Sequence, residues 1–236
     1  TRNTASFFVN MNNSGYSEPN IDALPNSVFD SEVFSLWSYI DHWGSWRAPQ
    51  GRIPGALSDV AHKNGVAVSG VSSIPWGGLT TEWETALNNY MTLGGSNISK
   101  YLHWYGVDGM GYNSEFSNYS TTFMNDLRTL HADLVREGKK VNSIFENIWY
   151  DGTNDNGVIQ FDLGLAGHNY KNFGDSNDPR TSLFFNYNWN RLDLDASASK
   201  ATSMGRDPHD LYCGMNMQGG EPNNTPWPKL LASKLS

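Results

Sequence analysis

The sequence predicts an α/β fold, and within that class a TIM-type (β/α)8 barrel with about seven of its eight strands present. Short β-prone runs alternate with helical segments, several runs are apolar almost throughout, and polar clusters follow nearly every run. Alternation of strand and helix is typical of α/β folds, and apolar strands are typical of parallel sheets. Polar clusters after so many strands favour a barrel over a doubly wound sheet, because a barrel gathers all its strand-to-helix loops at one face. No glycine-rich phosphate loop follows the first run, which also counts against the doubly wound sheet.

The strands and helices can be placed by the periodicity of their apolar residues and by the residues typical of helix ends. Strands are expected at Ser6–Met11, Phe34–Asp41, Val66–Ile74, Val107–Asn113, Val141–Trp149, Ser182–Asn188 and Leu211–Met217. Helices are expected at Pro54–Asn64, Thr81–Leu93, Ile98–Trp104, Thr121–Glu137, Leu194–Met204 and Trp227–Lys234. Apolar residues recur on one helical face from residue 123 to residue 135. Gly138, with Lys139 and Lys140 beside it, then predicts the end of that helix.

The length fits one domain. A chain of 236 residues can form a single (β/α)8-type barrel domain spanning 1–236. A closed barrel needs eight strands, however, and the count here stops at seven. We therefore expect the last strand to be missing and a further polypeptide segment to complete the barrel, since an open barrel exposes strand edges.

Composition excludes several classes of partner. The net charge of −8 argues against nucleic acid, which rewards clustered Lys and Arg. No apolar run approaches the roughly 18 residues of a membrane span. The single cysteine, Cys213, excludes an internal disulfide framework, and the six histidines show no metal-binding spacing.

Aromatic residues make up 13% of the chain and often stand beside Asn, Asp and Gly. That mixture suits sugar rings, although an aromatic-rich core explains it equally well.

The segment from Asp108 to Glu115 carries the sharpest chemical signal. Side chains alternate along a strand, so Gly111, Asn113 and Glu115 share one direction. If that direction is the barrel interior, Asn113 and Glu115 lie at the mouth, and the glycine clears space beside them. A capping pair at the start of the next helix is the plainer alternative.

This strand and several others resemble known glycosidases. The Asp-Gly-x-Asp-x-Asp-x-Glu strand of family 18 chitinases has the same spacing, and the Asn-x-Glu version is similar to family 85 endo-β-N-acetylglucosaminidases. The resemblance to family 85 extends in order along almost the whole chain. It is carried by Asp41-His42-Trp43, Ala61-His62-Lys63-Asn64-Gly65-Val66, Trp149-Tyr150-Asp151 and Phe184-Phe185-Asn186-Tyr187-Asn188-Trp189. The chain departs from the family pattern at Gly152, where Ser is usual, and at Ser72-Ser73, and these departures bear on subsite details.

The resemblance implies an enzyme that hydrolyses the GlcNAc-β-1,4-GlcNAc bond of the N-glycan core by a retaining, substrate-assisted route without a cofactor. Glu115 would be the acid and base, Asn113 would orient the 2-acetamido group, and Tyr150 would be the third catalytic residue. Substrate-binding candidates are His42, Trp43, Trp76, Trp149, Asp151, Asn186, Trp189 and Asn216. The alternative interpretation of Tyr150 is an aromatic residue at the rim of the barrel. For the tryptophans it is a position in the core.

Two other functions stay open from sequence. One is a glycan-binding barrel without turnover, against which the retention of both Asn113 and Glu115 argues. The other is a chitinase-like hydrolase of chito-oligosaccharides, against which Asn at position 113 argues. The compartment is also open, although an enzyme that acts on glycoproteins is often secreted or periplasmic.

Overall fold

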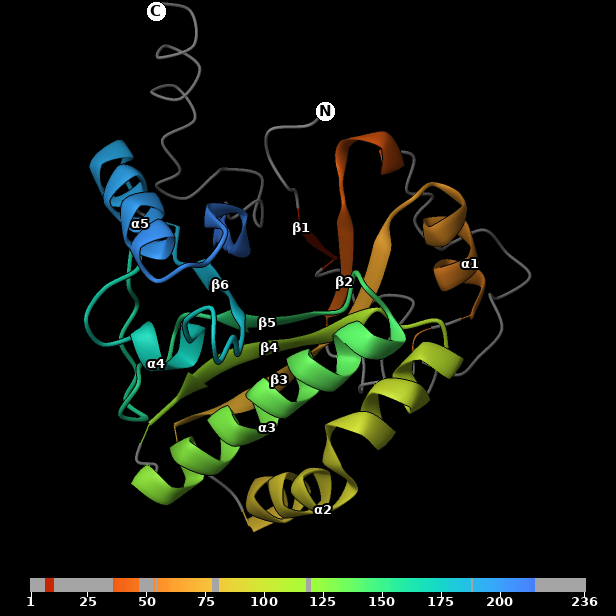
Figure 1. The fold of residues 1–236 in the computed structure, drawn as a ribbon, viewed down its shortest axis with the longest axis horizontal. Coiled ribbons are helices and arrows are strands. Elements are labelled where there is room, and N and C mark those ends of the chain that lie inside the picture. Colours follow the sequence, from red (N-terminus) through yellow and green to blue (C-terminus); the bar gives the residue numbers. More distant parts are fainter. Residues whose placement is uncertain are drawn as a thin grey trace, which may run out of the picture.

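In the computed structural model, the described residues form a curved sheet of seven parallel strands with helices between most of them (Figure 1). The structure describes residues 7–10, 36–46, 53, 55–77, 81–117, 120–187 and 189–214, with the backbone alone at 7–10, 45–46 and 72–76. The strands pair in sequence order, β1-β2-β3-β4-β5-β6-β7. They are β1 (Phe7–Asn10), β2 (His42–Trp46), β3 (Ala67–Gly77), β4 (Gly109–Phe116), β5 (Glu146–Tyr150), β6 (Ser182–Phe185) and β7 (Leu211–Cys213). This is a partial TIM-type (β/α) barrel, as predicted.

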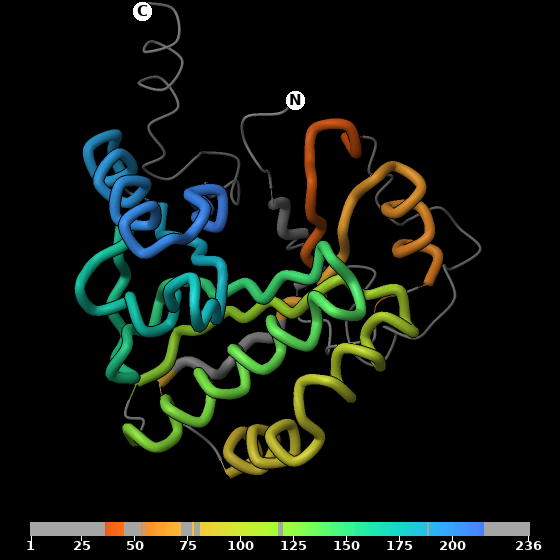
Figure 2. Tube along the Cα trace, viewed as in Figure 1, coloured from red at the N-terminus to blue at the C-terminus, as the bar shows by residue number. Residues whose placement is uncertain are grey.

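The helices cover the outer side of the sheet (Figure 2). They are α1 (Gly55–Lys63), α2 (Thr81–Trp104), α3 (Thr121–Val141), α4 (Tyr170–Phe173) and α5 (Arg191–Ser203), with short 3-10 turns at Trp37–Tyr39 and Pro208–Asp210. In the part of the chain described here, no helix is both long enough and apolar enough to cross a bilayer. The helix expected at Trp227–Lys234 lies outside the described residues.

The core lies between the sheet and its helices. Met110, Tyr112 and Phe116 on β4 point outward into it and are at most 7% exposed. From α3, Leu127 and Leu134 meet them from the other side. Because side chains alternate, the residues between them, Gly109, Gly111, Asn113 and Glu115, face the inside of the barrel.

One helix prediction differs from the structure for a steric reason, and another is confirmed. Gly138 does not end α3 but lies inside it, and the helix continues to Val141. A Cβ at Gly138 would overlap the Phe145 ring, so glycine serves close packing here rather than termination. Two helices are expected at Thr81–Leu93 and Ile98–Trp104, and α2 does consist of two helical segments, separated at Gly94, whose φ of 73° and ψ of 156° are not helical.

The second strand also differs from its prediction. The apolar run at Phe34–Asp41 contains a 3-10 turn at Trp37–Tyr39, and β2 begins only at His42. Trp37 packs against Trp43, with ring centroids 5.2 Å apart, so its apolar character serves the core beside the strand. The inward positions of β2 include His42 and Gly44, and such polar and small residues carry little β-strand signal.

The inside of the barrel has a polar floor at the amino ends of the strands. Glu146, at the start of β5, accepts hydrogen bonds from Ser182 Oγ at 2.5 Å and from Tyr212 Oη at 2.9 Å. His42 Nδ1 lies 3.4 Å from Glu146 Oε2, and His42 Nε2 lies 2.9 Å from Ser69 Oγ. The floor therefore joins β2, β3, β5, β6 and β7.

Replacing Glu146 by Gln should remove a stabilisation that depends on pH. Burial opposes ionisation of Glu146, but His42, Ser182 and Tyr212 outweigh it, and the pKa lies below its ordinary value of 4.5. The carboxylate therefore stabilises the fold above pH 4.5, and this contribution is lost as the pH falls through the lowered pKa. We expect Glu146→Gln to cost about 2 kcal/mol at pH 7, as for hydrogen bonds to a charged group. Urea unfolding at pH 7 and pH 3 measures it.

The exposed Glu84 on α2 supplies the control, because Glu84→Gln removes the same charge without touching the floor. An equal loss for Glu146→Gln at both pH values would contradict the assignment.

Candidate active site

Strand β4 delivers Asn113 and Glu115 to the carboxyl end of the barrel interior. Their side chains are partly exposed, while the outward neighbours Ser114 and Phe116 are fully buried. Asn113 Nδ2 donates a hydrogen bond of 2.9 Å to Glu115 Oε2. An ionised carboxylate can only accept hydrogen bonds, so it orients the amide nitrogen of Asn113 toward itself. The amide oxygen of Asn113 is then directed away from Glu115 and can accept from another group.

Strand β5 brings Tyr150 beside this pair. Tyr112 pairs with Trp149 in the β4–β5 register, so Tyr150 lies next to Asn113 on the inner face. Asn186, just after β6, donates from Nδ2 to Tyr150 Oη at 3.3 Å. Burial first, and then the neighbouring Tyr187 and Glu115, raise the pKa of Tyr150 above 10.0. The hydroxyl therefore keeps its proton at neutral pH and can donate it in a hydrogen bond.

Aromatic rings enclose Tyr150. Phe184 lies 5.6 Å away between ring centroids, Phe161 lies 6.2 Å away, and Tyr187 is stacked at 6.2 Å with planes 27° apart. Tyr187, Phe161 and Phe184 were not singled out by the sequence reasoning. The Asn-Tyr-Asn-Trp cluster contained a signal for Tyr187, whereas nothing near Phe161 distinguishes it from an ordinary loop residue.

The carboxyl ends of β4 and β5 are tied together at Gly152. Ser114 Oγ donates to the Tyr150 carbonyl, and Thr153 Oγ1 donates to the Ser114 carbonyl at 3.1 Å. A Cβ at Gly152 would lie 2.5 Å from the Ser114 oxygen and 3.0 Å from Glu115 Cγ. A glycine at this position thus permits the close approach that sets Glu115 against the end of β5.

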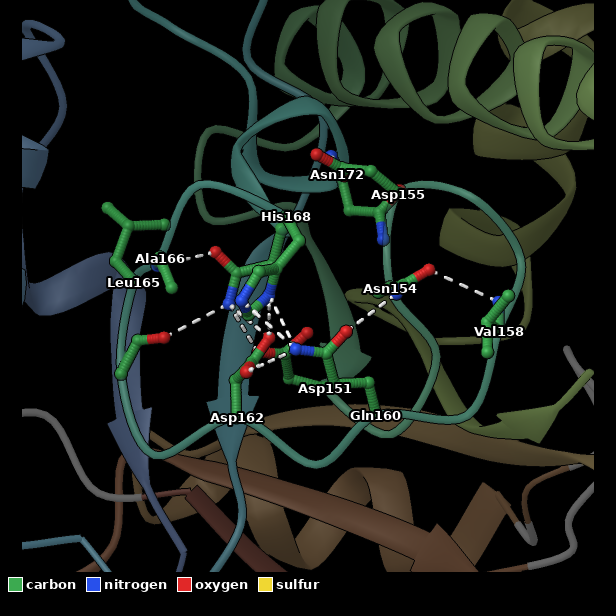
Figure 3. A network of polar contacts seen from close by, with 12 residues as sticks. Asp151, Asn154, Asp155, Val158, Gln160, Asp162, Leu165, Ala166, His168 and Asn172 are labelled. Atoms are coloured by element: carbon green, nitrogen blue, oxygen red, sulfur yellow. Dashed lines mark hydrogen bonds and ion pairs between the residues drawn. The ribbon is translucent and has the colours of Figure 1, made fainter.

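A polar network orders the loop that follows β5 (Figure 3). Asn169 Nδ2 donates to Asp151 Oδ2 at 2.6 Å and to the Gly164 carbonyl at 3.0 Å. His168 Nδ1 lies 2.7 Å from Asp162 Oδ2. Burial, together with Asp162 and Asp155, raises the pKa of Asp151 well above its ordinary value, although the Asn169 bond opposes this shift. Within the described residues, no group of three His, Cys, Asp or Glu side chains could hold a metal ion.

The structure brings together only part of the predicted substrate-binding set. Asn186 lies at the mouth beside Tyr150. Asp151 is fully buried in the loop network instead, so it supports the loop rather than lining the site. Trp149, two residues earlier in the sequence, is 1% exposed and packs against His131 of α3.

Three more of these residues are buried. Trp43 is 3% exposed in the core, and Trp189, which follows β6, is 5% exposed with its indole N–H bound to the carbonyl of Gly214 just after β7. His42 lies in the polar floor because β2 starts, rather than ends, at that residue. Trp76 lies on β3 with only its backbone described, and Asn216 lies outside the described residues.

Asp108, the first residue of the segment that carries Asn113 and Glu115, lies at the base of the barrel because it precedes β4. It accepts from Val68 N at 2.8 Å and Asn142 Nδ2 at 2.8 Å, and it lies 2.7 Å from His62 Nε2. It therefore joins β3, α1 and the end of α3 at the base of the barrel.

Comparison with known proteins places the chain in a family. Its fold is similar to the Spr0440 glycoside hydrolase domain of Endo-D from Streptococcus pneumoniae R6, with a TM-score of 0.75 and 20% identity. The match covers 95% of this chain and 36% of that one, so this chain spans about a third of its length. A comparison with curated proteins gives no match. The model of glycosyl hydrolase family 85 matches residues 16–234, and the chain therefore belongs to glycosyl hydrolase family 85.

Proposed function

We propose that this domain is the catalytic barrel of an endo-β-N-acetylglucosaminidase acting on the chitobiose core of N-glycans. One observation carries the proposal: Asn113 and Glu115 are hydrogen-bonded on the inner face of β4, next to Tyr150 at the end of β5. Membership of glycosyl hydrolase family 85 supports the class of reaction. The Endo-D name of the solved neighbour agrees with the proposed activity.

The residues favour a substrate-assisted route. A retaining glycosidase normally uses two carboxylates, one of them a nucleophile. Asn113 cannot be that nucleophile, because its side chain is an amide. Of Asn113 and Glu115, only Glu115 therefore carries a carboxyl group. The 2-acetamido oxygen of the substrate would then attack its own anomeric carbon, and holding it in place converts orientation into rate.

The protein groups then have distinct tasks. Protonated Glu115 gives its proton to the leaving oxygen as the glycosidic bond breaks and the acetamido oxygen closes the ring, which forms as an oxazolinium that keeps its N–H. Asn113 accepts the acetamido N–H through its free amide oxygen, and Tyr150 donates its hydroxyl to the acetamido group. In the second step, ionised Glu115 takes a proton from water as the water attacks the anomeric carbon and opens the oxazolinium ring, which restores the acetamido group and the starting configuration.

Mass spectrometry of a high-mannose glycopeptide and a chito-oligosaccharide, each incubated with the full-length protein, tests the proposal. Release of the glycan with one GlcNAc left on the peptide is the expected result. Binding without release would indicate a glycan-binding barrel, and cleavage of the chito-oligosaccharide alone would indicate a chitinase-like enzyme; either result would overturn the proposal. A thiazoline analogue of the oxazoline should bind tightly if the route is substrate-assisted.

Replacing Asn113 by Asp should change both the rate and its pH dependence. The variant places a second carboxyl group beside Glu115, across a contact that is now a 2.9 Å hydrogen bond. We expect kcat to fall at least about tenfold, which corresponds to 1.36 kcal/mol of the barrier. Like charges disfavour ionisation, so the alkaline limb of the pH–rate profile should move to higher pH.

Rates measured from pH 4 to pH 9 give both quantities. Asn88→Asp on the exposed face of α2 is a matched control, since it adds the same charge away from the barrel interior. An unchanged rate and an unchanged profile in Asn113→Asp would contradict the role given to Asn113.

A further inference from the structure

Three aromatic side chains near the carboxyl end of α2 are exposed although they lie against one another. Tyr101, Trp104 and Tyr105 keep 49%, 78% and 42% of their surface accessible. Tyr105 lies 4.7 Å from both neighbours between ring centroids, tilted by 53° from Tyr101 and nearly perpendicular to Trp104 at 88°. We call these three rings the aromatic patch. They form one connected surface rather than scattered exposed residues, and such surfaces mark interaction sites.

The aromatic patch lies at the opposite end of the barrel from the candidate active site. Helix α2 follows the carboxyl end of β3 and ends at Trp104, just before β4 begins at Gly109. Glu115 lies near the other end of β4. A molecule on the aromatic patch would therefore leave the mouth of the barrel open.

Polar groups flank these rings. Helix α1 lies beside the turn after Tyr105, because a Cβ at Gly106 would lie 3.4 Å from Ser58 Cβ and 3.8 Å from His62 Cε1. The His62 side chain is 40% exposed. Lys100 and His103, within α2 itself, are exposed as well. Aromatic faces with hydrogen-bonding groups at their edge suit a sugar better than an apolar protein surface.

We propose that the aromatic patch is a second carbohydrate site, which binds β-linked N-acetylglucosamine rings by stacking. A β-linked N-acetylglucosamine ring has all its large substituents equatorial, so both faces of the ring present C–H groups to an aromatic plane. Its acetamido and hydroxyl groups point outward, where groups such as His103 and Lys100 can hydrogen-bond them. The choice of this sugar rests on the proposed function, whereas the exposure of the rings does not.

Fluorine NMR of the full-length protein labelled with 5-fluorotryptophan tests the proposal. The protein carries Glu115→Gln to suppress turnover, and Trp104→Phe identifies the Trp104 signal by its loss. We expect triacetylchitotriose to shift this signal with a dissociation constant of about 1 mM, a usual strength for a weak contact, and maltotriose to leave it unchanged. Tyr101→Ala should weaken the binding several-fold, whereas Leu192→Ala, which removes a 79% exposed side chain on α5, should not.

Blocking the mouth with the thiazoline analogue separates the two sites. A Trp104 shift that persists with the mouth blocked supports the aromatic patch, and it does so even if glycan release is never observed. The proposal is overturned if the Trp104 signal does not move up to about 10 mM trisaccharide, a tenfold excess over the expected constant. It is also overturned if the shift vanishes when the mouth is blocked, or if the signal moves with protein concentration alone, which would indicate contact between copies.

Discussion

Replacing Glu115 by Gln should lower the rate of glycan release by about 10²–10⁴-fold, the usual contribution of general acid–base catalysis. Gln keeps the shape of the side chain and can still contact Asn113, so the change removes the transferable proton rather than the fold. The loss should be smaller for the first step on a nitrophenyl glycoside, because that leaving group departs without protonation. Single-turnover rates on the glycopeptide and on the nitrophenyl substrate measure the two cases.

The matched control is Glu84→Gln on the exposed face of α2, which should leave both rates unchanged. Wild-type hydrolysis in Glu115→Gln would exclude Glu115 as the acid. An equal loss on both substrates would show that the variant disturbs the site in some other way than by removing a proton.

Replacing Gly152 by Ala should damage both stability and activity. The added methyl group would lie 2.5 Å from the Ser114 carbonyl oxygen, a backbone atom that cannot turn aside, and 3.0 Å from Glu115 Cγ. Overpacking of this kind costs about 1–3 kcal/mol. The ends of β4 and β5 must separate to admit the methyl group, so we expect Glu115 to move and kcat to fall at least about tenfold.

Thermal unfolding and kcat, measured side by side, separate the two effects. Gly167→Ala in the same loop is the control, since a Cβ there meets nothing within 4 Å. If Gly152→Ala matched this control in both measurements, the close approach of β4 and β5 would have no importance for the site.

Much of the fold could be predicted from sequence because its strands alternate visibly with its helices. The parallel β3 is apolar at its start and was placed within a few residues of its observed bounds. β2 was misplaced because its inner face carries His42 and Gly44, which resemble loop residues until the floor of the barrel is known. The end of α3 was misplaced because Gly138 makes room for the Phe145 ring just before β5, a contact that the residues around Gly138 do not reveal.

The same distinction, between local pattern and contacts from elsewhere in the chain, holds for the residues of the candidate site. Asn113 and Glu115 follow from strand alternation, which depends only on neighbouring residues. Trp43 and Trp149 lie on the outer faces of their strands, in the core. Because side chains alternate along a strand, an error of one residue in placing the strand would put them on the inner face, where they could stack on a sugar. The support from Gly152 and Asn169 depends on contacts between segments that no local pattern brings together.

The polar floor of the barrel has a consequence for how the chain folds. Neighbouring strands in the sheet are also neighbours in sequence, so the sheet can grow by adding one strand at a time. The contact between His42 and Glu146 is different, because it spans β3 and β4 and requires the sheet to have curled already. We expect contacts that depend on this curling to be absent from the folding transition state. Mutations in the polar floor should therefore speed unfolding while leaving the folding rate nearly unchanged. The polar floor thus stabilises the curved sheet kinetically, by slowing its unfolding.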